Sequence, residues 1–406
     1  MTALVDRPAT AANVILLDDD RWDRVLAATH GEAAACYQCG TCTATCPWGL
    51  VAGPSIGVRS VIREAQLGID GWAEAVWRCT TCGACEARCP HQVPIGEVML
   101  GLRGLAWRER TAPGELSSVL WDMHWDGNPW GRPPSTRSAW AAGLDIPRFD
   151  PGIHTTLLYI GCTASYDRRA QKVARAVVGL MRAGGVPFGT LGDDEPCCGD
   201  PARSLGNDAY FERIAAANAA QFKVAGVTDI VTVSPHCYDT FSSHYGAAGD
   251  QFQVRHYSQL ARDLIAEGKL TFSGLEATSA TFHDPCYLAR HHDETEAPRA
   301  MLAAIPGLEL AEMERSRSET LCCGGGGGRM WMETPADERF ATARAREAAA
   351  TGAAYLVTTC PHCISCLEDG VSVAGARDLK VIDLAELAML AGCVSAPTTS
   401  PEASHD

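Results

Sequence analysis

Residues 36–47 read Cys-Tyr-Gln-Cys-Gly-Thr-Cys-Thr-Ala-Thr-Cys-Pro, and residues 79–90 repeat the spacing as Cys-Thr-Thr-Cys-Gly-Ala-Cys-Glu-Ala-Arg-Cys-Pro. Three thiolates spaced this closely wrap one face of a [4Fe-4S] cluster, and the fourth cysteine of such a run binds the other cluster. A pair of zinc sites is the alternative, but a zinc ion needs only four thiolates in a closed tetrahedron. The two runs therefore predict two cubane clusters and decide the fold of the N-terminal part.

The crossed arrangement of the runs assigns ligands to both cubanes. Cluster one is assigned to Cys36, Cys39, Cys42 and Cys89, and cluster two to Cys79, Cys82, Cys85 and Cys46. Gly40 and Gly83 lie inside the loops, where the backbone passes close to inorganic sulfide and a side chain has least room. Between the runs, residues 57–68 have helical spacing, with one apolar face made of Val58, Val61, Ile62 and Ala65. We expect this helix to serve packing rather than binding.

The composition argues against several classes of protein. The chain has 406 residues, a formal net charge of −15 and 19 cysteines, and its start has neither a basic segment nor a long apolar one. An odd number of cysteines without a secretion signal argues against a disulfide framework, so reduced thiols or ligands in a cytoplasmic protein are expected. The negative charge argues against nucleic acid as a partner. We also expect no membrane span, because no apolar run reaches ~18 residues.

The C-terminal half contains one cysteine pattern twice. A strand-like segment leads to a first cysteine, a vicinal pair follows 35 or 36 residues later, and a further cysteine follows a second strand-like segment. The first copy supplies Cys162, Cys197, Cys198 and Cys237, and the second supplies Cys286, Cys322, Cys323, Cys360 and Cys363. Strand-like segments at 155–160, 229–233, 280–283 and 355–358 alternate with helical patterns at 211–225 and 339–351. This alternation predicts βαβ units and parallel sheets, with cysteines at the carboxyl ends of strands.

Cysteine spacing and joins rich in proline and tryptophan divide the chain into segments. The linker between the halves shows little periodicity and contains Trp121, Trp125, Trp130 and Trp140. We expect a helical unit with both cubanes at residues 1–110, an irregular linker at 111–152, the two repeats at 153–275 and 276–395, and a disordered tail at 396–406.

Five cysteines in the second repeat are one more than a cubane cluster or a zinc ion needs. Adjacent cysteines such as Cys322 and Cys323 are too close for a relaxed disulfide, whereas neighbouring thiolates can bridge irons, so an unusual cluster is favoured. The glycines at 324–328 either let the backbone approach a cluster or substrate, or serve only a tight turn. In the first repeat Ser234 stands in the place of Cys360, which leaves a four-cysteine cluster, a lone bridging site and a degenerate scaffold open.

Other polar residues near the cysteines have two readings each. Four histidines could either deliver protons or make purely structural hydrogen bonds: His236, His283, His291 and His362. Three further residues could stabilise a thiolate or shape a pocket: Arg290, Arg329 and Trp331. The two remaining thiols, Cys366 and Cys393, are expected to be ordinary small core residues.

Three segments of the second repeat together resemble a CCG domain. They are residues 283–290 (His-Asp-Pro-Cys-Tyr-Leu-Ala-Arg), 322–332 (Cys-Cys-Gly-Gly-Gly-Gly-Gly-Arg-Met-Trp-Met) and 360–363 (Cys-Pro-His-Cys). Residues 30–394 resemble the fused C and B subunits of heterodisulfide reductase. The D-subunit branch is closest, with relatives in sulfite reductase membrane complexes and electron-transfer-flavoprotein:quinone oxidoreductases. The resemblance implies an α+β, multi-domain fold: an α-helical ferredoxin domain followed by two α/β, Rossmann-like, parallel-sheet CCG repeats.

Complete CCG motifs of that family hold noncubane [4Fe-4S] clusters, which implies one such cluster in the second repeat. Its ligands and the catalytic residues are then Cys286, Cys322, Cys323, Cys360 and Cys363. An additional cofactor site in the first repeat is open, with the candidate residues Cys162, Cys197, Cys198 and Cys237. Ser234 departs from the pattern of family members that split a disulfide between two such clusters.

Two functional hypotheses follow. In the first, the chain is an oxidoreductase subunit that passes electrons between its cubanes and a noncubane site acting on a thiol, a disulfide or a quinone-linked partner. In the second, it is a pure electron-transfer subunit of a flavin-dependent dehydrogenase for 2-hydroxyacids or acyl-CoA, with no substrate of its own. The resemblance implies a flavoprotein partner (similar to electron-transfer flavoprotein, to the A subunit of heterodisulfide reductase or to a flavin dehydrogenase), a membrane cytochrome b subunit, or both. The expected location is the cytoplasm, or the inner face of the membrane through such a partner.

Overall fold

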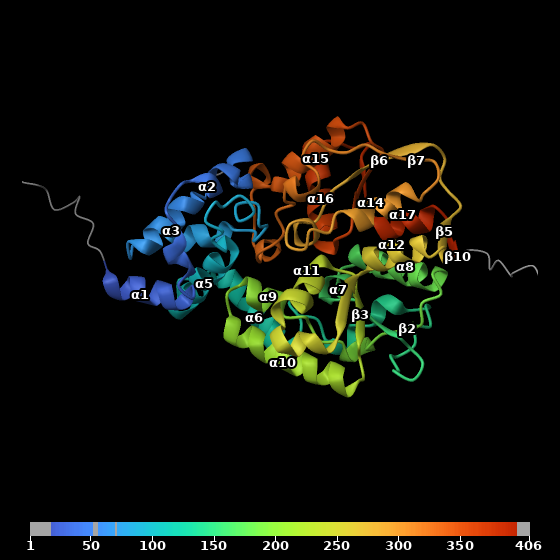
Figure 1. Cartoon of the computed structure of the whole chain (residues 1–406), viewed down its shortest axis with the longest axis horizontal. Coiled ribbons are helices and arrows are strands. Elements are labelled where there is room, and N and C mark those ends of the chain that lie inside the picture. Colours follow the sequence, from blue (N-terminus) through green and yellow to red (C-terminus); the bar gives the residue numbers. More distant parts are fainter. Residues whose placement is uncertain (1–17, 52–55, 70, 396–406) are drawn as a thin grey trace, which may run out of the picture.

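The structure is a computed structural model that describes residues 18–51, 56–69 and 71–395. The tail expected at 396–406 lies outside the described residues. A helical N-terminal part lies at one end of the long axis, and two α/β repeats fill the other end (Figure 1).

Short helices build the N-terminal part around the two cysteine runs. They are α1 (Asp19–Ala28), α2 (Thr41–Thr45), α3 (Val58–Gln66), α4 (Trp72–Ala75) and α5 (Ile95–Arg108). The Asp18 carboxylate caps α1 by accepting a hydrogen bond from the Arg21 amide. The helix predicted between the runs is confirmed as α3, whose buried residues are Val58, Val61, Ile62 and Ala65. Its apolar face packs into the core of the N-terminal part, as expected for a packing helix.

The segment 111–152 is only partly irregular, which corrects the expectation from its sequence. Residues Gly114–Asp126 form helix α6, which buries Leu116, Val119 and Met123. These side chains are three and four residues apart, which is the spacing of one helix face. Short 3-10 turns follow at Pro134–Thr136 and Ala139–Ala141.

Each repeat is built on a four-stranded parallel sheet, so the predicted parallel α/β character is confirmed. The first sheet has the order β2-β1-β3-β4, with β1 (Thr156–Tyr159), β2 (Phe188–Gly189), β3 (Asp229–Thr232) and β4 (Gln253–His256). The second has the order β7-β6-β8-β9, with β6 (Thr278–Phe282), β7 (Leu308–Leu310), β8 (Tyr355–Thr358) and β9 (Lys380–Asp383). The strands predicted before the cysteines are β1, β3, β6 and β8. The edge strands β4 and β9 were not predicted.

Helices cover the sheets of both repeats. The first repeat contains α7 (Cys162–Tyr166), α8 (Ala170–Ala183), α9 (Asp200–Ser204), α10 (Asp208–Val224), α11 (Pro235–Asp239) and α12 (Tyr257–Ala266). The second contains α13 (Cys286–Ala289), α14 (Glu296–Ala303), α15 (Phe340–Ala350), α16 (Pro361–Ala374) and α17 (Leu384–Leu390). The helical patterns at 211–225 and 339–351 are thereby confirmed as α10 and α15.

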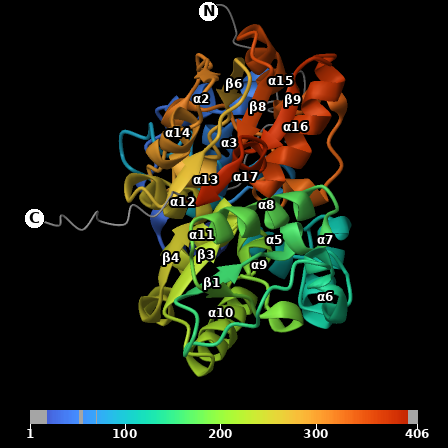
Figure 2. The same ribbon diagram turned by 90° about the vertical axis from the view of Figure 1, so that its right-hand side faces the viewer.

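The two repeats share one hydrophobic core. Helix α8 packs against α17 and α12 against α14, so helices of the two repeats face each other where they meet (Figure 2). The core contains Leu158 and Val231 from the first sheet and Phe282 and Val357 from the second. An antiparallel pair of β5 (Leu270–Phe272) and β10 (Cys393–Ser395) joins the chain between the repeats to its C-terminal end. The repeats therefore form one packed body, with cysteines of both repeats near their contact.

Candidate functional site

The first cysteine run and the last cysteine of the second run surround one small cavity. Its lining includes Cys36, Cys39, Cys42 and Cys89. Gly40 has φ +88°, a left-handed conformation that favours glycine and turns the loop. Cys39 is the only exposed cysteine of the nineteen, and all nineteen are free thiols. This grouping is the one that the crossed assignment of cluster one requires.

The thiols assigned to cluster two also lie close together. Burial, and then the charges of Cys82 and Cys79, raises the pKa of Cys46 to about 12. Burial, followed by the charges of Cys82, Cys79 and Cys46, also raises the pKa of Cys85 well above its ordinary value. Buried thiols of this kind stay protonated until a metal replaces the proton, and closely spaced sulfurs are the soft donors that iron–sulfur clusters use. The residues present therefore fit a cluster.

The second run touches the second repeat. The Cys322 thiol donates a hydrogen bond to the Thr80 hydroxyl at 3.6 Å. A hydrogen bond shared with Cys322, together with burial, raises the pKa of Cys82 well above its ordinary value. Arg290, which the sequence singled out, donates to the carbonyl of Cys82 at 3.2 Å rather than to a thiolate. Cysteines of the second run and of the second repeat thus face each other directly.

The cysteines of the second repeat converge beyond the carboxyl ends of β6 and β8. The sulfurs of Cys363 and Cys323 are 3.4 Å apart, and Cys286 shares a hydrogen bond with Cys322. Burial opposes ionisation of Cys360, but hydrogen bonds, that of Cys363 first, lower its pKa well below the ordinary value. Five buried cysteines that contact one another in this way fit a cluster with more than four thiolate ligands.

His283 belongs to the same group. One of its ring nitrogens and the sulfurs of Cys323 and Cys363 all lie within 4.8 Å of one another. The side chain is buried, and its Nδ1 accepts a hydrogen bond from Arg344 Nε at 3.1 Å. The structure therefore places the histidine that flanks the first cysteine of this repeat directly against the cysteine cluster.

The glycine segment 324–328 lies against the backbone of the second cysteine run. A Cβ on Gly326 would be 2.4 Å from the Thr80 carbonyl oxygen, and one on Gly327 would be 2.4 Å from that of Cys79. Gly327 and Gly328 also have positive φ angles of +58° and +77°. Both the turn and the close approach thus require glycine, but the approaching group is the N-terminal part of the same chain.

Arg103 joins three parts of the molecule, and the sequence reasoning missed it. The side chain is fully buried in α5. Its guanidinium donates to four carbonyl oxygens, those of Val76 (3.0 Å), Cys79 (2.6 Å), Ser204 (2.5 Å) and Gly327 (2.9 Å). The available signal was one arginine inside the apolar run 98–106, because arginine is almost never buried unless its charge is bound.

The cysteines of the first repeat form a second group. Hydrogen bonds between neighbouring thiols link Cys162, Cys197, Cys198 and Cys237. Arg137 donates to the Cys162 sulfur at 3.5 Å and forms a buried ion pair with Glu195 at 2.8 Å. A guanidinium beside thiolates balances negative charge, so this group also fits an anionic cluster. The sequence around Arg137 and Glu195 contains no local pattern that predicts this ion pair.

Ser234 has a structural role in the first repeat. Its hydroxyl accepts a hydrogen bond from the His236 amide at 3.3 Å and caps α11. Cys360 occupies the matching cap position of α16 and makes no side-chain cap bond. The same position therefore supplies a helix cap in one repeat and a soft thiolate in the other.

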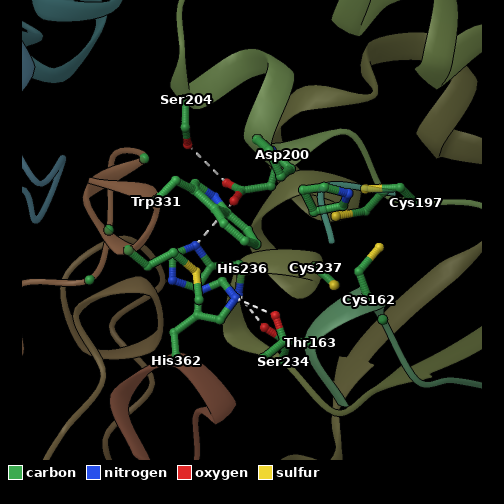
Figure 3. A pocket seen from close by; sticks show the side chains of 18 of the residues that line it. Cys162, Thr163, Cys197, Asp200, Ser204, Ser234, His236, Cys237, Trp331 and His362 are labelled. Carbon is green, nitrogen blue, oxygen red and sulfur yellow. Dashed lines mark hydrogen bonds and ion pairs between the residues drawn. The ribbon is translucent and has the colours of Figure 1, made fainter. Parts of the chain in front are cut away.

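A cavity between the repeats brings two histidines together (Figure 3). The second repeat contributes Gly325, Gly326, Trp331 and His362 to its lining. The rings of His236 and His362 are 4.3 Å apart, His236 Nδ1 lies 3.4 Å from Asp200, and His362 Nε2 lies 2.8 Å from the Thr163 hydroxyl. Burial opposes protonation of His236, but Asp200 raises its pKa well above the ordinary value. Burial, and then the charge of His236, lowers the pKa of His362 to about 4. The pair therefore holds its proton on His236.

His291 lies against the loop of the second cysteine run, where a Cβ on Gly83 would be 3.3 Å from its Nε2. Its Nδ1 is 3.6 Å from the buried Asp239 carboxylate, which also contacts His292 at 3.0 Å, and its Nε2 is 3.0 Å from the Thr81 carbonyl oxygen. Trp331 makes an edge contact with Trp130 at 5.2 Å. These contacts give His291 a packing role between segments, whereas Trp331 both packs on Trp130 and lines the cavity that holds His236 and His362.

A larger cavity of about 400 Å³ opens beside Cys323. Its lining includes Trp48, Gly324, Arg329, Phe340 and Cys366. The guanidinium of the buried Arg329 lies over the Trp48 ring at 5.6 Å. Cys366 is only partly buried and lines this cavity, contrary to the expectation of a core residue, whereas Cys393 is buried in β10 as expected.

Comparison with known proteins identifies the parts of the chain. The cysteine-rich CCG domain matches residues 156–242 and 280–368, and a 4Fe-4S dicluster domain matches residues 32–93. A probable membrane-anchored ferredoxin of Chromohalobacter salexigens is 33% identical over 92% of this chain and 61% of its own length. The EtfAB:quinone oxidoreductase of Syntrophomonas wolfei is 34% identical over 78% and 46%. The D subunit of the dihydromethanophenazine:CoB–CoM heterodisulfide reductase of Methanosarcina acetivorans is 28% identical over 87% and 92%.

The chain spans 61% and 46% of the length of the first two of these relatives, and most of the third. In the part of the chain that the structure describes, no helix has the length and apolar character needed to cross a bilayer. The resemblance to the D-subunit branch and to quinone-linked relatives is confirmed. The chain belongs to the iron–sulfur proteins that join a 4Fe-4S dicluster domain to a pair of CCG cysteine-rich domains.

Proposed function

We propose that this chain is the iron–sulfur subunit of an oxidoreductase, in which two cubane clusters exchange single electrons with a noncubane [4Fe-4S] cluster of the second repeat. The cubanes take the crossed ligand sets given above, and the noncubane cluster takes Cys286, Cys322, Cys323, Cys360 and Cys363. The segment boundaries at 1–110, 111–152, 153–275 and 276–395, and a Rossmann-like class for both repeats, belong to the same proposal.

The contact between Cys82 and Cys322 carries this proposal. Cys82 is a ligand candidate of cluster two, Cys322 is one of the second repeat, and Cys322 lies close enough to Cys82 to raise its pKa. Thr80 and the glycines at 326 and 327 close the same boundary. Electron transfer between the two sites would cross only touching ligands, whereas the exposed Cys39 of cluster one reaches the surface. The order supported is surface, cluster one, cluster two and second repeat, in either direction.

The substrate end of this path is the cavity beside Cys323. It combines a candidate cluster ligand with the buried Arg329 and the aromatic side chains of Trp48 and Phe340. Arg339 and four carboxylates, those of Asp167, Glu333, Glu338 and Asp369, also line it, so the cavity offers both apolar and charged groups to a thiol, a disulfide or a quinone-level acceptor. A disulfide or a quinone takes up two electrons and two protons, and His236, whose pKa is raised by Asp200 and then by Cys360, could supply a proton.

Chemistry should centre on the second repeat, because Ser234 caps a helix where Cys360 offers a thiolate. The four cysteines beside Arg137 remain available for an additional cluster in the first repeat. Such a cluster would be a store or an exit for electrons, reached through the cavity that holds His236 and His362.

A pure electron-transfer role within a flavin-dependent dehydrogenase is the second candidate. The name of the Syntrophomonas wolfei relative, an EtfAB:quinone oxidoreductase, favours a flavoprotein partner, and that of the Methanosarcina acetivorans relative favours a heterodisulfide. In either case the chain would act in the cytoplasm or at the inner face of the membrane, with a flavoprotein, a membrane cytochrome b subunit or both.

Anaerobic metal analysis and EPR test the proposal. We expect about eight iron atoms from the N-terminal part and about four or more from the C-terminal half, by cluster stoichiometry. Cys323→Ser should abolish the noncubane signal and turnover while dithionite still reduces both cubanes. Cys198→Ser should change that signal less, and Cys393→Ser is the neutral control. Stoichiometric zinc with little iron would disprove the proposal.

The same variants separate the two candidates. If Cys323→Ser stops the reduction of a low-molecular-weight disulfide or of a short-chain quinone, the second repeat is a reaction site. If Cys323→Ser transfers electrons from a flavoprotein to an artificial acceptor as fast as the wild type, the chain is an electron-transfer subunit only. Equal loss of one signal in Cys323→Ser and Cys198→Ser would mean that both repeats form one composite site.

A further inference from the structure

We propose that His283 donates a hydrogen bond from its Nε2 to a sulfur of the cluster held at Cys323 and Cys363, and thereby raises the reduction potential of that cluster. The inference rests on the proposed function for the presence of the cluster. It adds a group that is neither a cysteine nor a ligand to iron.

Arg344 fixes the tautomer of His283. The guanidinium has five N–H donors and no acceptor, so His283 Nδ1 must accept the 3.1 Å hydrogen bond from Arg344 Nε. A neutral imidazole whose Nδ1 accepts carries its proton on Nε2.

Arg344 is itself held rigidly. It is fully buried on α15, donates to the carbonyl oxygen of Arg315 at 2.7 Å and pairs with Glu347 at 2.9 Å. A third hydrogen bond at 3.2 Å reaches the Thr320 hydroxyl. The orientation of the His283 ring is therefore set from one side by three independent contacts of its partner.

In the described part of the chain, the N–H group at His283 Nε2 still lacks a hydrogen-bond acceptor. His283 is 1% exposed, and within the described residues its Nε2 makes no hydrogen bond. A buried N–H without an acceptor costs about 1–3 kcal/mol, so an acceptor is expected beside it. One ring nitrogen of His283 and the sulfurs of Cys323 and Cys363 lie within 4.8 Å of one another, so these sulfurs are the acceptors that we assign to Nε2. Hydrogen bonds to sulfur stabilise the more negative, reduced form of an iron–sulfur cluster and raise its potential.

The first repeat lacks this device. Three positions before its first cysteine stands Tyr159, where the second repeat has His283. The Tyr159 hydroxyl donates to the Pro196 carbonyl at 2.6 Å and so has its own partner. The two repeats therefore differ at this position as well as at Ser234. The cluster of the second repeat would therefore have the higher reduction potential and would accept electrons from cluster two.

An anaerobic redox titration followed by EPR tests the proposal. In His283→Leu the second-repeat signal should remain, and its equilibrium with cluster two should shift about tenfold toward the oxidised form, which is 59 mV for one electron. His283→Gln, which can still donate an N–H, should recover part of the shift. Tyr159→Phe is the matched control and should leave the potential unchanged.

Pulsed EPR and ENDOR on the wild type decide the case even if His283→Leu fails to bind its cluster. We expect a weakly coupled proton that exchanges in D2O and whose coupling changes in His283→Gln and in Arg344→Met. A strong nitrogen coupling would show an imidazole bound to iron and would overturn the proposal, as would an unchanged potential in His283→Leu. Absence of any noncubane signal in the wild type would instead refute the proposed function.

Discussion

Replacing Arg103 with methionine should uncouple the N-terminal part from both repeats. The guanidinium is buried and binds carbonyl oxygens of the second cysteine run, of the first repeat through Ser204 and of the second through Gly327. Methionine fills similar space but donates nothing, so four buried carbonyl groups lose their partner. Each unsatisfied group costs roughly 1–3 kcal/mol. Removal of a buried cation returns part of that sum, so we expect a loss of about 4 kcal/mol.

The loss of stability in Arg103→Met should appear as reduced cooperativity of unfolding rather than as an equal shift of the urea midpoint for all signals. Urea unfolding of the cluster-loaded protein, followed in parallel by cluster absorbance and by far-UV circular dichroism, should give one transition in the wild type. In Arg103→Met the cluster absorbance should be lost at a lower urea concentration than the helical signal, because coincident transitions require one cooperative unit. Arg108→Met, at an exposed position of the same helix, is the control. If both variants unfold in one transition at the same midpoint, the tie through Arg103 is dispensable and the reasoning is refuted.

Three further outcomes are expected. Cys46→Ser should damage the EPR signal of the cluster bound by residues 79–85 more than that of its own run, and loss confined to the latter would contradict the crossed pairing. Burial lowers the pKa of His256 to about 4. The unfolded chain therefore binds more protons between pH ~6.5 and ~4, and stability should fall across that window by about 3 kcal/mol as the pH is lowered. Equal pH slopes for the wild type and His256→Gln in urea titrations would exclude this. Gly326→Ala, whose Cβ would meet the Thr80 carbonyl at 2.4 Å, should slow electron transfer from cluster two to the second repeat in rapid freeze-quench EPR. Gly114→Ala, which meets nothing within 4 Å, should not.

Local spacing predicted those features that depend on neighbouring residues. The cysteine runs, the apolar face of α3 and the strands before each cysteine are all encoded within about ten residues. The edge strands β4 and β9 were missed because they read Gln-Val-Arg-His and Lys-Val-Ile-Asp, with exposed or half-exposed outer residues and no apolar run. Edge strands face solvent on one side and lose the signal that buried strands carry. Helix α6 was missed because its two tryptophans and its opening Gly114 masked a short buried face.

Contacts between distant segments could not be read from spacing. The hydrogen bond between Cys322 and Thr80 joins residues 242 positions apart, and that between Arg344 and His283 spans 61. Nothing near Thr80 in the sequence marks it as the neighbour of a second cysteine group. The glycines at 324–328 were recognised as unusual, but only the folded chain places the cysteine run against them.

The close contact of Gly326 and Gly327 with the second cysteine run sets the order of two events, cluster loading and docking of the two halves. Once the halves have docked, Cys82 is 8% exposed and Cys322 is 1% exposed, and backbone atoms cover the boundary between them. A maturation factor that delivers iron and sulfide can reach these thiols only while the halves are apart. Translation presents residues 36–89 first, so loading of the N-terminal part would precede closure by the C-terminal half. If the two halves docked before the clusters were loaded, the cysteines at their boundary would be buried without iron.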